Sequence, residues 1–232
     1  MAKWWLGCAG LLWALAGRAA DEIPSVQQWA RVFEVVRQHA LFHGLEVRYA
    51  KSPAANVGYT PIGVVMGEGT GCKVVIAEGE NPKMRSIMRF GRSPAELQTL
   101  MFTAAAHELG HCLRLRLRQM PADLWSLVAS ADPGTPEQHA MERQASYEEA
   151  YADAYALVYM RNAHPALFAQ ALQQMQALRG AAAFATAYYQ VHPLYAVLER
   201  QGLDTRLPLQ QQVDAVMAAA AFGYVARNGV TP

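Results

Sequence analysis

The chain has 232 residues, of which 53% are hydrophobic and 17% are charged. This length suits one domain with its own core, and the composition excludes a disordered tail. Lys and Arg number 20 against 19 Asp and Glu, for a net charge of +1. Because phosphate binding needs a clustered positive surplus, no nucleic-acid partner is expected.

The chain begins with the features of an export signal. Lys3 supplies a positive start, an uncharged apolar run covers residues 4–17, and small residues follow. We expect a signal peptide over residues 1–20, one folded domain over 21–232, and a periplasmic or secreted protein. The run is shorter than the about 20 apolar residues of a membrane span. The alternative is an uncleaved segment that keeps the protein beside the membrane.

A helix and three strands are predicted next. The helix begins at Ser25, which forms a capping-box pattern with Gln28 and precedes apolar residues at helical spacing. The strands are short, rich in Val, Ile or Tyr, and bounded by Gly, Pro or Asn; they cover residues 45–50, 62–66 and 73–77. The glycine-rich residues 67–71 predict a hairpin or flap between the last two strands.

The rest of the chain has a helical pattern. Ser93, Pro94 and Glu96 form a helix start, and Pro121 stops this helix after about residue 118. Further helices are predicted over residues 122–129, 135–162, 165–179, 181–190, 193–201 and 209–227. A small β-rich part thus precedes a helical part, which is an α+β arrangement.

The apolar helix that starts at Ser93 contains the sequence His107-Glu108-Leu109-Gly110-His111. Two histidines four residues apart lie on one face of a helix, so both rings can reach one zinc ion. Glu108 lies one step around the helix and can reach a water at the metal as a general base. Buried imidazoles and carboxylates are costly without partners, and a metal is the expected partner. The alternative is a chance match in an amphipathic helix.

A third zinc ligand is predicted on the helix over residues 135–162. A catalytic zinc site has three protein ligands and one open position. Glu149 and Asp153 lie four residues apart on one helix face. Glu149 can bind the metal, and Asp153 can accept a hydrogen bond from the far nitrogen of a ligand histidine. Glu148 points about 100° away and is the weaker candidate.

Together these two segments resemble a gluzincin-type zinc metallopeptidase, in which HExxH is followed on a later helix by ExxxD. Residues 107–111 and 149–156 are similar to the HELGH…ExxAD signature of the prenyl-protease and heat-shock-protease class. The resemblance implies a zincin-like fold and hydrolysis of a peptide or protein substrate. It also implies zinc ligation by His107, His111 and Glu149, with Glu108 as base.

No sequence pattern identifies the remaining catalytic residue or settles whether the two cysteines pair. The oxyanion that develops during hydrolysis needs a further hydrogen-bond donor. His192 is the first candidate for this catalytic role, followed by Tyr195 and Tyr188; ordinary interhelical aromatics and a surface histidine are the alternative. Cys72 and Cys112 either pair as a disulfide, as an oxidising compartment allows, or stay free thiols.

The same ligands fit two other functions. A non-catalytic binding or assembly protein could use zinc only to stabilise its core, and an amidohydrolase could cleave cell-wall peptides or a small amide. In the peptidase interpretation, an extended substrate adds to a sheet edge, with residues 62–66 or 73–77 as the edge strand.

Overall fold

The structure is a computed structural model. It describes residues 24–42, 44–53, 62–66, 72–78, 87–121, 123–181, 192–200 and 202–220. The signal peptide expected over residues 1–20 lies outside these ranges. So does the helix expected over 181–190, with Tyr188, apart from residue 181.

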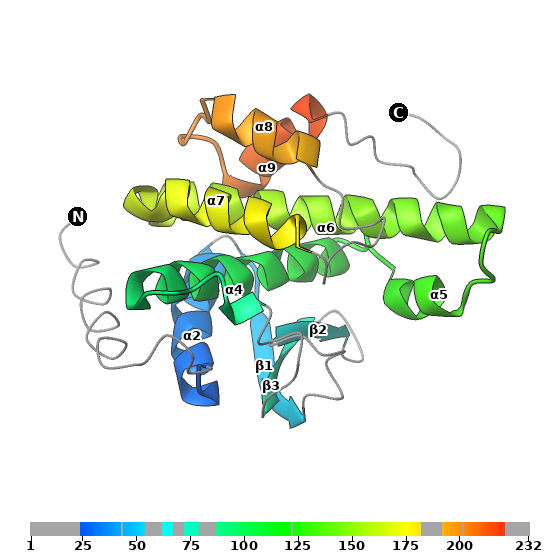
Figure 1. Ribbon diagram of the computed structural model, residues 1–232, viewed down its shortest axis with the longest axis horizontal. Helices are drawn as coiled ribbons and strands as arrows, with labels where there is room; N and C mark the ends of the chain where they lie inside the picture. The colour runs from blue at the N-terminus through cyan, green and yellow to red at the C-terminus, as the bar shows by residue number, and fades with distance from the viewer. Residues whose placement is uncertain are drawn as a thin grey trace.

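Helices predominate among the described residues, and a small sheet accompanies them (Figure 1). The helices are α2 (Val26–Phe42), α4 (Pro94–Arg116), α5 (Leu124–Ser130), α6 (Pro136–Ala163), α7 (Phe168–Arg179), α8 (His192–Arg200) and α9 (Leu209–Ala219), with a 3-10 turn η2 (Pro165–Leu167) before α7. The strands are β1 (Val47–Pro53), β2 (Ile62–Met66) and β3 (Cys72–Glu78). A short β-rich segment followed by a run of helices is the order that the sequence predicts.

Side-chain caps explain where the helices begin. The predicted capping boxes at Ser25 and Ser93 are both present, with reciprocal bonds between each serine and the residue three positions later. At α6, Thr135 Oγ1 accepts a hydrogen bond from Gln138 N at 3.1 Å. The Gln138 side chain instead accepts one from Gly134 N at 2.6 Å. This third cap is therefore one-sided but still satisfies a free N–H of the first turn.

The sheet has the strand order β1-β3-β2, with β1 parallel and β2 antiparallel to β3. Met66 pairs with Cys72, so β2 and β3 have the register of a hairpin; its connecting residues lie outside the described ranges. Residues 73–77 belong to the central strand β3, and residues 73–76 pair with a neighbouring strand on both sides. The prediction that they offer a sheet edge is wrong for this reason, whereas β2 lies at an edge of the sheet among the described strands.

Helices α4 and α6 lie side by side through the middle of the molecule (Figure 1). On its other sides α4 contacts α2, the sheet and α7. A Cβ atom added to Gly110 would lie 2.8 Å from Ala152 Cα and 3.0 Å from Tyr155 Cβ. Since real side chains do not approach a backbone so closely, only glycine fits at this crossing. Buried Ala145 and Ala156 keep the facing surface of α6 equally shallow.

A disulfide joins Cys72, the first residue of β3, to Cys112 on α4, with Cα atoms 5.3 Å apart. Both cysteines are buried. This separation lies within the usual disulfide range of about 4.4–6.8 Å. The sheet is therefore covalently tied to α4 at the position directly after His111.

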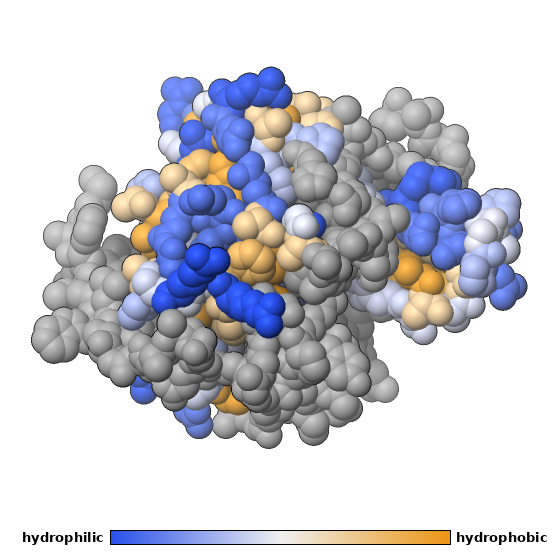
Figure 2. All heavy atoms as spheres, in the orientation of Figure 1, coloured by the Kyte–Doolittle hydropathy of each residue, from blue (hydrophilic) through white to orange (hydrophobic). Residues whose placement is uncertain are grey.

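The visible surface is largely hydrophilic over the N-terminal end of α6, with hydrophobic side chains gathered over the neighbouring α5 (Figure 2). In α5, Trp125 and Val128 are half-buried and pack against the core. Across the described ranges, no helix combines the length and apolar character needed to cross a bilayer.

Candidate metal centre

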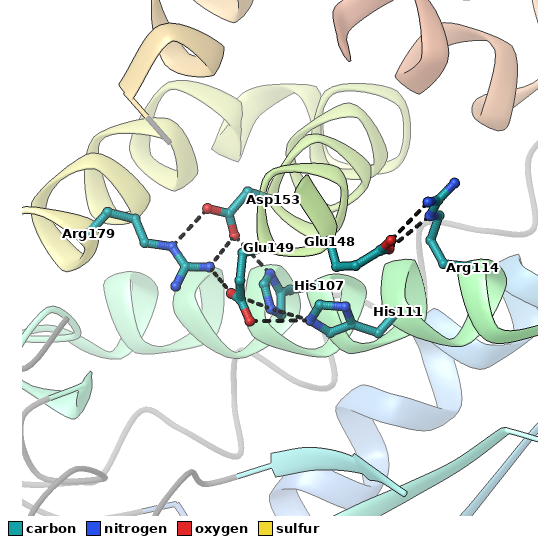
Figure 3. A network of polar contacts seen from close by, with 7 residues as sticks. All are labelled: His107, His111, Arg114, Glu148, Glu149, Asp153 and Arg179. Carbon is teal, nitrogen blue, oxygen red and sulfur yellow. Dashed lines mark hydrogen bonds and ion pairs between the residues drawn. The ribbon is translucent and has the colours of Figure 1, made fainter. Parts of the chain in front are cut away.

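His107 and His111 lie one turn apart on α4 and point toward α6 (Figure 3). Their Nε2 atoms are 3.1 Å apart. Two nitrogens that each bind one tetrahedral zinc ion at about 2.0–2.1 Å would be about 3.3 Å apart. The two rings are therefore already close to the spacing that a shared ion requires.

Glu149 reaches the same place from α6. Its Oε2 lies 3.6 Å from His107 Nε2, and its Oε1 lies 3.7 Å from His111 Nε2. The three ligand atoms all lie within 4.8 Å of one another, a spacing at which one metal ion could be held. Glu149 is 6% exposed and His111 5%. The segments predicted to supply the ligands thus come together as one largely buried cluster with the spacing to hold a metal ion.

Asp153, one turn after Glu149, orients the first histidine. His107 Nδ1 donates to Asp153 Oδ1 at 2.8 Å, which directs the Nε2 lone pair at the cluster. Burial alone would raise the pKa of Asp153, but the Arg179 guanidinium and the His107 bond hold it below its ordinary value. The carboxylate therefore stays charged. This contact is the one that the sequence assigned to Asp153.

Arg179, the last residue of α7, contacts the cluster, and the sequence did not reveal it. Its Nε donates to Asp153 Oδ2 at 2.8 Å, and its Nη2 donates to Asp153 Oδ1 at 2.7 Å and Glu149 Oε2 at 2.8 Å (Figure 3). The side chain is 4% exposed. A single basic residue in the last turn of a helix is an ordinary helix-end pattern, so no local signal distinguishes it.

Glu108 directly follows His107 in α4 and is half-buried. Burial raises its pKa to about 7, an effect that the nearby His107 partly opposes. The sequence suggests the role of general base for this residue, which requires its carboxyl group to take up and release a proton.

Glu148 faces away from the cluster, as the helical angle predicts. Arg114 donates to its two carboxylate oxygens at 2.8 and 2.9 Å, and Gln144 donates to it at 2.6 Å. Figure 3 shows this pair pointing away from the histidines along α4. Adjacent glutamates on α6 therefore have different partners, and Glu148 is engaged elsewhere.

Of the candidate oxyanion donors Tyr195 and His192, the structure describes the side chain of Tyr195 only. Tyr195 is buried, and its hydroxyl donates to Asp153 Oδ2 at 2.8 Å. It therefore supports the carboxylate that accepts from His107, and the catalytic role expected for Tyr195 stays a prediction. His192 is the first residue of α8, and its side chain lies outside the described part of the structure.

The second histidine is held mainly by packing. His111 Nδ1 is buried and has no hydrogen-bond partner among the described residues. The Trp125 ring of α5 meets the His111 ring edge to face, with centroids 6.0 Å apart. Among the described residues, His107 therefore has a carboxylate that accepts a hydrogen bond from its Nδ1, and His111 does not.

Comparisons of the chain with protein families, with curated proteins and with solved structures gave no match.

Proposed function

We propose that this chain is an exported zinc metallopeptidase with a zincin-like fold and with His107, His111 and Glu149 as metal ligands. The observation that carries the proposal is the convergence of these three donor groups from two helices. Two imidazoles and one carboxylate are a donor set of catalytic zinc peptidases, which keep a fourth position for water or substrate. Zinc, when bound, lowers the pKa of water and polarises the scissile carbonyl.

Each neighbouring residue has a defined task in this proposal. The Glu108 carboxylate takes a proton from the attacking water and passes it to the leaving amine nitrogen. Asp153 fixes the orientation of His107. An extended peptide adds to the edge strand β2, which contacts α4. His192, at the start of α8, is the proposed donor to the oxyanion.

Export belongs to the same proposal. It is supported by the apolar, uncharged residues 4–17 after Lys3. The disulfide between Cys72 and Cys112 also supports it, because such bonds persist in oxidising compartments.

A purely structural zinc site is the weaker proposal. Structural sites use four protein ligands, whereas the cluster found among the described residues has three members. The adjacent acid, Glu148, is engaged by Arg114. An amidohydrolase of cell-wall peptides would use the same residues as a peptidase, so the two differ only in substrate.

The test measures metal content and hydrolysis together, for the wild type, for Glu108→Gln and for the control Glu137→Gln. Glu137 lies on the exposed surface of α6. We expect about one zinc ion per chain in all three proteins. Hydrolysis of a peptide library should fall about 10²- to 10⁴-fold in Glu108→Gln alone.

Three results would count against this assignment. A wild type that binds no metal removes the proposed site. A Glu108→Gln variant with full activity removes the proposed base. Hydrolysis of cell-wall peptides without any cleavage of the peptide library favours the amidohydrolase.

A further inference from the structure

Arg179 is placed to control how Glu149 binds a metal ion. Its Nη2 donates to one Glu149 oxygen, Oε2, at 2.8 Å. The other oxygen, Oε1, lies 3.7 Å from His111 Nε2, and Oε2 itself lies 3.6 Å from His107 Nε2. Both oxygens therefore face the histidines, and the bond from Arg179 distinguishes Oε2 from Oε1. A carboxylate can bind a metal through one oxygen or through both. A short charge-assisted bond to one oxygen opposes the two-oxygen mode.

The same guanidinium is itself fixed in place. Its Nε and Nη2 donate to both oxygens of Asp153, and Asp153 accepts a further bond from Tyr195. Asp153 also accepts from His107. The buried Arg179 guanidinium therefore connects Asp153, which supports His107, to Glu149.

From this geometry we propose that Arg179 is a positioning residue that holds Glu149 as a one-oxygen metal ligand and so preserves an open coordination position. This inference rests on the proposed metal site. It assigns to α7 a part in the metal chemistry, although α7 supplies no ligand.

The contacts to Asp153 and Glu149 depend on the planar shape of the Arg179 guanidinium as well as on its positive charge. Arg presents several N–H groups in a fixed plane, whereas Lys is a point charge on a flexible stem. A nearby positive charge by itself opposes the binding of a cation. Weaker metal binding after loss of the charge would therefore report lost positioning and not electrostatics.

The test compares Arg179→Lys and Arg179→Met with two matched variants, Arg114→Lys and Arg114→Met. Arg114 forms a similar buried two-bond pair, but with Glu148. Each protein is loaded with Co²⁺, whose visible absorption depends on coordination number, and Zn²⁺ affinity is measured by chelator competition.

We expect both Arg179 variants to bind Zn²⁺ about 10- to 100-fold more weakly, as is typical when the partner of a metal ligand is lost. Their Co²⁺ absorption should also weaken, because a two-oxygen Glu149 raises the coordination number. The Arg114 variants should keep the wild-type affinity and spectrum. An Arg179→Lys protein with wild-type affinity and spectrum, or an Arg179→Met protein with tighter binding, overturns the inference.

A measurement on the unmodified protein covers the case in which the variants do not fold. In a crystal structure of the zinc-loaded wild type, one Glu149 oxygen should lie about 2.0–2.2 Å from the metal, with the other on Arg179. Two oxygens at that distance would overturn the inference but leave the proposed function intact. A wild type that takes up neither metal overturns both.

Discussion

The substitution Gly110→Ala tests whether the close crossing of α4 and α6 builds the metal cluster. The new Cβ would lie 2.8 Å from Ala152 Cα, so the two backbones must separate by about 0.6 Å to restore an ordinary contact of 3.4 Å. Metal–ligand distances tolerate only about 0.2 Å. Since His107 and His111 lie on one helix and Glu149 on the other, this displacement should weaken metal binding at least about tenfold.

Stability should change less than metal binding. Overpacking a core costs about 1–3 kcal/mol, and replacing glycine by alanine within a helix returns about 1 kcal/mol. The net loss of about 1 kcal/mol corresponds to a melting temperature lowered by about 2–4 °C for a chain of this size. The assays are thermal denaturation of the metal-free protein and zinc titration against a competing chelator.

Gly202→Ala is the matched control, because Gly202 is exposed and a Cβ there meets nothing within 4 Å. It should change stability by no more than about 0.5 kcal/mol and leave zinc affinity unchanged. If Gly110→Ala binds zinc as tightly as the wild type and melts no lower, α4 and α6 can accommodate the extra methyl group. The close crossing then does not determine the geometry of the cluster.

Three further predictions follow from the buried polar contacts. Asp153→Asn should weaken zinc binding about 10- to 100-fold by calorimetry, because a ligand histidine loses its charged acceptor; unchanged affinity would show that this contact is dispensable. Arg114→Met should lower the free energy of unfolding in urea by about 3–5 kcal/mol, because Glu148 is left buried without its cation, and a neutral effect would contradict this. Burial lowers the pKa of His164 below 6.5, so its stabilising effect is present at higher pH and is lost as the pH falls through the lowered folded pKa. Acidification should therefore reduce the stability of the wild type more than that of His164→Gln, and equal losses would refute the shift.

Features encoded by neighbouring residues were predictable from the sequence. The caps at Ser25 and Ser93 each depend on a partner three residues later, and the structure contains both. The positions of Glu149 and Asp153 on one face follow from helix geometry alone. The packing role of Gly110 could also be suspected, since glycine within a helix is otherwise unfavourable.

Distant pairings that no sequence motif signals were not predictable. Arg179 contacts residues 26 and 30 positions earlier, and no periodic pattern links helices so far apart. The same holds for the strand order, where the last strand in sequence takes the central place. Tyr195 is the clearest case, because only the packing of α8 shows that its hydroxyl faces Asp153.

The bonds around Asp153 also couple parts of the fold that supply none of the proposed metal ligands. Besides α4 and α6, which carry those proposed ligands, α7 contributes Arg179 and α8 contributes Tyr195. By thermodynamic linkage, an ion bound only to the native state at 100 times its dissociation constant stabilises that state by about 2.7 kcal/mol. Removing the ion with a chelator would therefore speed amide hydrogen exchange in the helices α7 and α8 as well, far along the chain from either histidine.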